Sequence, residues 1–348
     1  MSDLLPWHQE AWNRLAASAD SLHHGLILNG LSGIGKREFS VALAQRLLCA
    51  RRENLNPCGD CQNCKLFVAG THPDLHVITS EYEATEGRID LISRYSDRYQ
   101  DVVARGKKAN PSQVIPVDQI RTLIERFYQS SHISDSRIAL IVPADRMNAN
   151  AANALLKLLE EPPAGAFFLL VTDQPGILPA TIRSRCVNES LPTPSSDQAE
   201  KWILTQISDA DLTQLPVNVS AGPIDFVADQ QSGLFQQQLE NLKRIDSLLN
   251  GQSDPLDLAS QMVKQDAVPL LNWMHKLVFD MIKWQGAGQV PMWADQSSLK
   301  IDRVSATMLY KLYDKLGSYR RMARDQLNVQ LALEEILISF QNAIRANG

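Results

Sequence analysis

The stretch Gly30-Leu31-Ser32-Gly33-Ile34-Gly35-Lys36-Arg37 decides how the first half of the chain folds. It follows the apolar run Leu26-Ile27-Leu28, which predicts a buried strand, and precedes a helical pattern from Glu38 to Cys49. A strand, a glycine-rich loop, a lysine and a helix form the context that a phosphate-binding loop requires. The glycines let backbone N–H groups turn toward a phosphate, and the helix N-terminus adds partial positive charge. The candidate nucleotide-binding residues are Gly30, Gly33, Gly35 and Lys36.

Three positions, in two motifs, depart from the pattern of an active ATPase. Arg37 stands where a Ser or Thr hydroxyl should hold Mg²⁺. The apolar run Arg137–Val142 predicts a second buried strand, which in a P-loop ATPase would end in an acidic pair, yet Val142 and Pro143 occupy those positions. Asp145 follows in the wrong register to replace them. The sequence therefore predicts a P-loop fold without ATP hydrolysis and leaves nucleotide binding without turnover open.

Four of the five cysteines form a compact pattern directly behind the P-loop helix: Cys49-x8-Cys58-x2-Cys61-x2-Cys64, rich in turn-forming residues. Four thiolates at this spacing can surround Zn²⁺ and leave no open position for water, which is typical of a structural site. A redox Cys-x-x-Cys motif is the alternative interpretation. The fifth cysteine, Cys186, is distant in sequence and is predicted to be a buried core thiol.

Short apolar strands alternate with helical patterns up to Pro192-Thr193-Pro194, which predicts a parallel α/β sheet. Beyond that linker the pattern is helical only, at 197–208, 232–250, 256–264, 267–286, 303–318 and 320–346. The fold class is therefore α/β followed by all-α. The polar segment 81–116 is predicted to be a solvated surface excursion, with a helix over Ile89 to Ala104 and a loop over Gly106 to Pro116. An auxiliary contact surface for DNA or a partner is the alternative.

Composition bounds the remaining choices. The 348 residues are 44% hydrophobic and 21% charged, as in an ordinary globular protein of two or three domains. A net charge of −5 argues against a protein that coats nucleic acid. No apolar run reaches membrane-spanning length, and the N-terminus lacks the features of a secretory signal, so a cytoplasmic location is expected.

These motifs together resemble the subunits of the bacterial clamp loader, AAA+ proteins of the DNA polymerase III holoenzyme. The resemblance rests on Gly30–Lys36, the four-cysteine insertion, Asn153–Pro163 and Ser184-Arg185-Cys186, and on Leu327–Glu334 near the C-terminus. It is closest to the subunit of the loader that has lost ATP hydrolysis and serves as its stator. It implies a AAA+ module over 1–192 with a zinc module at 49–64 and an insertion at about 81–116. A helical lid over 193–235 and a helical collar over 236–348 would follow.

The resemblance also implies roles and partners. Arg185 would act as an arginine finger in the ATP site of a neighbouring subunit; an arginine that pairs with a carboxylate at the sheet edge is the alternative. Asp225 stands where active relatives carry a nucleotide-sensing arginine. The implied partners are the gamma/tau ATPases and the delta subunit in a hetero-pentamer, together with the sliding clamp and primer–template DNA. An active AAA+ motor subunit and a free-standing zinc-containing nucleic-acid binder are the competing hypotheses.

Overall fold

The computed structural model describes residues 4–18, 21–51, 55–100, 111–128, 133–207, 222–231, 234–291, 294, 297–298, 301–322 and 327–345. Two compact units divide the chain, Met1–Ala199 and Glu200–Gly348. The first is an α/β unit and the second is helical, which confirms the predicted fold class. The finer boundaries at 192 and 235 stay predictions.

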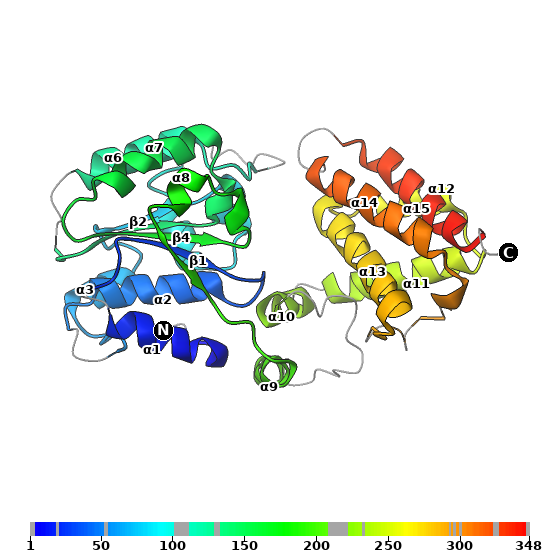
Figure 1. Ribbon diagram of the computed structural model, residues 1–348, viewed down its shortest axis with the longest axis horizontal. Helices are drawn as coiled ribbons and strands as arrows, with labels where there is room; N and C mark the ends of the chain where they lie inside the picture. Colours follow the sequence, from blue (N-terminus) through cyan, green and yellow to red (C-terminus); the bar gives the residue numbers. More distant parts are fainter. Residues whose placement is uncertain are drawn as a thin grey trace. The chain divides into compact units, whose positions relative to one another are not determined.

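A parallel five-stranded sheet organises the first unit, in the order β2-β3-β4-β1-β5 (Figure 1). Its strands are β1 (Gly25–Asn29), β2 (Leu75–Ile78), β3 (Arg137–Ile141), β4 (Ala166–Thr172) and β5 (Val187–Ser190). The central strands are short, apolar and buried, because helices cover both faces of a parallel sheet.

Alternation along the strands supplies both hydrophobic layers. In β1, Leu26 and Leu28 belong to one core cluster and Ile27 to the other. Helices α1, α2 and α3 lie on one side of the sheet, and α6, α7 and α8 lie on the other (Figure 1). The helices of this unit are η1 (Pro6–His8), α1 (Gln9–Ala17), α2 (Lys36–Leu48), α3 (Gln62–Val68), α4 (Glu81–Glu86), α5 (Asp90–Ser96), α6 (Val117–Phe127), η3 (Ala144–Arg146), α7 (Ala149–Glu160), η4 (Pro175–Ile177) and α8 (Ala180–Arg183).

The prediction of a solvated excursion is wrong for residues 81–100. Ile92, Tyr95 and Tyr99 of this segment are buried in the cores of the α/β unit. The Tyr95 hydroxyl donates to the carbonyl of Phe67, 3.0 Å away, so the segment is held against α3. The helix predicted over 89–104 is shorter, since α5 ends at Ser96. Residues 101–110, which include the end of this predicted helix and part of the predicted loop, lie outside the described residues.

The second unit is built from helices around a core of its own. It begins within α9 (Ser196–Gln206) and continues through α10 (Pro223–Gln231), α11 (Leu234–Leu249), α12 (Pro255–Met262), α13 (Ala267–Ala287), η8 (Ile301–Arg303), α14 (Ala306–Met322) and α15 (Val329–Arg345). The single helix predicted over 320–346 is wrong: its first residues end α14, and a separate helix begins at Val329. The outer ends of the predicted helices at residues 208, 232 and 346 lie outside the described residues.

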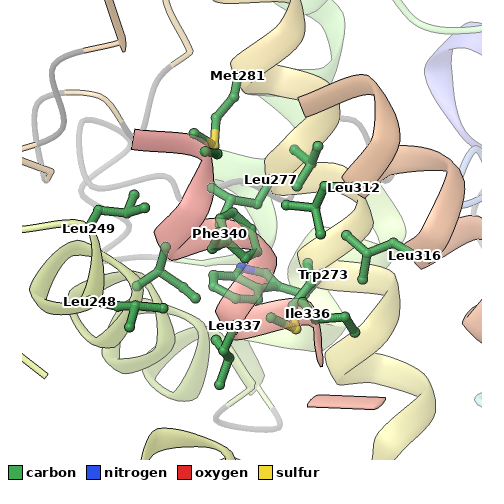
Figure 2. Packing of buried hydrophobic residues seen from close by; sticks show 14 of the residues in the cluster. Leu248, Leu249, Trp273, Leu277, Met281, Leu312, Leu316, Ile336, Leu337 and Phe340 are labelled. Atoms are coloured by element: carbon green, nitrogen blue, oxygen red, sulfur yellow. The ribbon is translucent and has the colours of Figure 1, made fainter. Parts of the chain in front are cut away.

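Trp273 of α13 and Phe340 of α15 lie at the centre of this helical core, among leucines of α11, α13, α14 and α15 (Figure 2). Both aromatic side chains are buried, Phe340 completely. Several helices contribute to this one core, so the second unit has a hydrophobic core of its own. Within the described residues, no helix combines the length and the apolarity needed to cross a membrane.

Candidate functional site

The glycine loop joins β1 to α2, as the sequence predicts. Gly30, Gly33 and Gly35 all have positive φ, and Gly35 sits in the left-handed region at the N-cap of α2. A Cβ on Gly30 would meet the Cδ1 of Ile34 at 2.7 Å and the carbonyl oxygen of Leu191 at 3.1 Å. The loop backbone therefore requires glycine, since a side chain would be both strained and obstructed.

Lys36 is buried and paired within the chain. Its side chain is 2% exposed, and Nζ lies 2.6 Å from Oδ1 of Asp173. Nζ also donates to the carbonyl of Leu31 in the same loop. Asp173 directly follows β4, whose last residue Thr172 is in register with Asn29 at the end of β1. A carboxylate of this chain thus supplies the negative charge that a phosphate would bring to this lysine.

Arg37 is also paired with a carboxylate. Its Nε and Nη2 donate to the two carboxylate oxygens of Glu83 at 2.7 and 3.0 Å. Burial lowers the pKa of Arg37, but Glu83, with smaller contributions from Asp173 and Glu38, more than offsets this and the pKa is raised, so the guanidinium stays charged. Ser80 caps the short helix α4 and holds Glu83 in its first turn. A cation therefore occupies the P-loop position where active relatives present a metal-binding hydroxyl.

The carboxyl end of β3 carries apolar residues. Val142 is fully buried, and Asp145 follows in the next turn with only 7% of its side chain exposed. The Thr172 hydroxyl donates to Oδ1 of Asp145 at 2.6 Å. Asp145 thus serves as an acceptor that ties the turn after β3 to the end of β4.

The structure brings Cys49, Cys58, Cys61 and Cys64 together, with all four sulfurs within 4.8 Å of one another. The Sγ atoms of Cys49 and Cys61 lie 4.0 Å apart, and those of Cys58 and Cys64 lie 3.9 Å apart. Tetrahedral Zn²⁺ with Zn–S bonds of about 2.3 Å places its sulfurs about 3.8 Å apart. The donor type and the spacing fit a closed four-thiolate metal site.

Local backbone geometry supports the cysteine cluster. Backbone N–H groups of Cys58, Cys61 and Cys64 donate to sulfurs at 3.3 to 3.4 Å. The N–H of Cys61 is the largest influence on Cys58 and lowers the pKa of that thiol to about 6. Burial raises the pKa of Cys49 and of Cys64, which disfavours their thiolate form unless a cation lies nearby.

Two side-chain bonds fasten this cysteine segment to the helices beside it. Asn63 donates to the carbonyl of Leu48 at the end of α2, 2.8 Å away. Trp12 of α1 donates through its indole nitrogen to Asn56, 3.0 Å away. A metal bound by the thiols would therefore lock the segment against α1 and α2 rather than stand free in solvent.

Arg185 lies on the surface at the start of β5, with 35% of its side chain exposed. Its Nη2 is 2.6 Å from Oε1 of Glu160, and its Nη1 donates to the carbonyl of Thr181 at 2.9 Å. A carboxylate partner is thus present, as the alternative interpretation of the sequence requires. The segment packs closely against the first residue of β1, Gly25. A Cβ added at Gly25 would lie only 2.9 Å from the sulfur of Cys186 and 3.2 Å from the carbonyl oxygen of Arg185.

Cys186 itself is only partly buried, although it packs against the α/β core. Burial raises the pKa of this thiol to about 11, so it stays protonated at neutral pH. The prediction that this thiol packs against the core and not in the metal cluster is confirmed, but the predicted burial is only partial.

Sequence reasoning missed three carboxylates: Glu83, Glu160 and Asp173. Asp173 could have been found, because parallel strands end at the same edge of a sheet and Asp173 directly follows the strand beside β1. Glu160 lies in the quoted Asn153–Pro163 motif but had no assigned partner. Glu83 offered no signal, since it lies 46 residues from Arg37 in a polar segment.

Comparison with known proteins agrees with this geometry. A family model described as "DNA polymerase III, delta subunit" matches residues 7–195, and one described as "DNA polymerase III, delta subunit, C terminal" matches residues 232–342. The chain is 30% identical to DNA polymerase III subunit delta′ of Yersinia pestis, covering 97% of this chain and 96% of that protein. It is 28% identical to subunit delta′ of Pseudomonas aeruginosa, covering 98% of each.

A crystal structure of a DNA polymerase III gamma subunit-related protein from Thermotoga maritima has the same fold, with a TM-score of 0.54 and 17% identity. The match covers 96% of this chain and 99% of that one. The glycine loop on a five-stranded parallel sheet, the four-cysteine cluster and the helical second unit agree with a subunit of the DNA polymerase III clamp loader. The chain belongs to the family of the DNA polymerase III delta′ subunits.

Proposed function

We propose that this chain is a non-hydrolysing stator subunit of the DNA polymerase III clamp loader. It would assemble in the cytoplasm with the gamma/tau ATPases and the delta subunit and support ATP-dependent loading of the sliding clamp on primer–template DNA. The observation that carries the proposal is the internal pairing of the P-loop, in which Lys36 binds Asp173 and Arg37 binds Glu83.

This pairing bears directly on catalysis. Phosphoryl transfer depends on positioning and on neutralising the charge of the phosphates, and a metal ion does much of the latter. Here the lysine is already neutralised, and Arg37 stands in place of the metal-binding hydroxyl. Val142 and Pro143 offer no carboxylate to orient water. The chain can therefore act on ATP only at a site that another subunit provides.

The position of Arg185 supports action in trans. The P-loop follows the carboxyl end of β1, whereas Arg185 precedes the amino end of β5, which runs parallel to β1. The four residues of β5 span about 13 Å at about 3.3 Å per residue. An arginine at the opposite end of the strands lies away from its own loop, which supports the proposal that it contacts a neighbour's nucleotide. Its planar, always charged fork suits phosphate oxygens.

The cysteine cluster has a structural role in this proposal. Zn²⁺ held by Cys49, Cys58, Cys61 and Cys64 would leave no coordination position for water or substrate. Its contribution is to the folding of the segment between α2 and α3. Zinc would therefore take no part in the reaction at the neighbouring ATP site.

The test uses the purified chain and the reconstituted loader. Alone, the chain should hydrolyse no ATP; turnover that Lys36→Ala abolishes would instead identify an active motor subunit. In the loader with clamp and primer–template DNA, Arg185→Ala should leave assembly intact and reduce ATPase at the bordering site by roughly 10³-fold or more. Arg185→Lys should restore little. Arg183→Ala, on the same exposed turn, is the matched control. Full activity of an assembled Arg185→Ala loader would refute the finger.

A further inference from the structure

Glu160 holds the proposed arginine finger in a defined geometry. Its Oε1 lies 2.6 Å from Nη2 of Arg185. Nη1 of the same guanidinium donates to the carbonyl of Thr181 at 2.9 Å and more weakly to the hydroxyl of Ser184 at 3.4 Å. The guanidinium is thus held from two sides, by a carboxylate on α7 and by the backbone of α8.

The location of Glu160 argues against a role in the stability of its own helix. It is the last residue of α7, where the exposed carbonyl dipoles disfavour a carboxylate and favour a cation. Lys157 supplies that cation in the last turn. The side chain of Glu160 is 50% exposed, so it contributes little apolar packing. Its interaction in the structure is with Arg185, 25 residues along the chain.

We propose that Glu160 is a positioning residue for the arginine finger, an inference that rests on the proposed function of Arg185. Arginine carries five N–H donors in a rigid fork. The bonds to Glu160, Thr181 and Ser184 account for three of them, so two donors are not used by these partners. A guanidinium can donate two N–H groups side by side to two phosphate oxygens, here those of a nucleotide on a neighbouring subunit.

Glu160 acts by restricting rotation. A free arginine side chain explores many rotamers, and ordering it at the moment of reaction weakens its effect. A partly exposed ion pair raises the population of one side-chain geometry over the others by a factor of up to about 5. Loss of the Glu160 charge should therefore slow the bordering site by about 2- to 5-fold, far less than loss of the arginine itself.

The experiment measures steady-state ATPase in the DNA- and clamp-stimulated loader, with inactivating substitutions in every ATP site except the one that borders this chain. Glu160→Gln removes the charge and keeps an acceptor oxygen of the same length. Glu161→Gln, the adjacent exposed glutamate beyond the helix end, is the matched control. Glu160→Asp tests whether a shorter carboxylate partly restores the rate.

We expect Glu160→Gln to lower kcat by about 2- to 5-fold with an unchanged KM for ATP, because an oriented finger matters in the transition state. The deficit should shrink at high salt, which screens the ion pair in the unmodified chain. Glu161→Gln should behave as the unmodified chain. A merely structural role would alter assembly instead, and it would not depend on salt in this way.

The outcomes separate the two proposals. If Arg185→Ala abolishes activity at the bordering site and Glu160→Gln leaves kcat unchanged, the positioning role is wrong and the finger stands. If Glu160→Gln raises kcat, the carboxylate restrains the finger and the positioning role is again overturned. If Arg185→Ala itself has no effect, the proposed function fails and this inference fails with it.

Discussion

Replacing either partner of the Lys36–Asp173 pair tests whether the P-loop lysine is a structural counter-ion. The lysine side chain is 2% exposed, while the carboxylate is 36% exposed and keeps access to water. Breaking a fully buried pair from one side costs about 3–5 kcal/mol. Solvent at Asp173 reduces this, so we expect Asp173→Asn and Lys36→Met each to destabilise the α/β unit by about 1–3 kcal/mol. The double variant should be less destabilised than the sum, with a coupling energy of about 1–2 kcal/mol.

The measurement is a double-mutant cycle on the opening free energy of β1 and β4, read by hydrogen exchange of their backbone amides in urea. Site-specific exchange separates the α/β unit from the helical unit, whose unfolding would otherwise overlap. The control cycle uses Asp118 and Arg121, an i,i+3 pair whose side chains are 81% and 66% exposed. Its coupling should stay below about 0.5 kcal/mol. A Lys36–Asp173 coupling no larger than this control would refute the structural role of the lysine.

Three further predictions concern other parts of the chain. Zinc should co-purify at one ion per chain, and Cys61→Ser should release it and loosen segment 49–70 to proteolysis while circular dichroism of the sheet is kept; zinc retained after replacement of all four thiols would contradict this. Burial, then the nearby charge of Lys36, lowers the pKa of His8 to about 4. The unfolded chain protonates His8 below about pH 6.5 and the folded chain only below about pH 4, so stability falls as pH drops through this window; His8→Phe should flatten that fall by up to about 3 kcal/mol in acid denaturation, and an unchanged slope would count against it. Phe340→Ala should cost the helical unit about 3–5 kcal/mol in urea denaturation, because a fully buried ring leaves a cavity; a cost under about 1 kcal/mol would show a core that collapses freely.

The predictable parts of the fold are those in which local pattern and burial coincide. The runs that became β1, β3 and β4 are short, apolar and flanked by loop residues, and they lie at the centre of the sheet. Strand β5 has the polar sequence Val187-Asn188-Glu189-Ser190 and was not predicted. It lies at the sheet edge, where pairing to β1 and not hydrophobic burial defines the strand.

The residues 81–100 were misjudged for a related reason. Their average composition is polar, but Ile92, Tyr95 and Tyr99 enter the core at i, i+3 and i+7, the spacing of one helical face. Tertiary contacts, such as the bond from the Tyr95 hydroxyl to Phe67, therefore decide the placement of this segment. The helical spacing of these three apolar residues was present in the sequence, but the polar residues around them hid which face is buried.

The same distinction applies to the candidate site. The thiols cluster as expected because their ligand spacing is encoded within a few residues. The carboxylates that bind Lys36, Arg37 and Arg185 come from distant segments, and only the folded sheet and the helix ends bring them close. Spacing can predict a metal site, whereas ion pairs across the fold need the structure.

The close approach between Gly25 and Cys186 has an evolutionary consequence. The first residue of β1 has no room for a side chain, because the sulfur of Cys186 and the carbonyl of Arg185 occupy that space. A methyl group at position 25 would push the segment that carries Arg185 away from the sheet unless position 186 became smaller at the same time. We therefore expect that a relative with a residue larger than glycine at position 25 carries a smaller residue at position 186. The first residue of the buried strand β1 thus restricts which residues can stand at position 186, next to the surface residue Arg185.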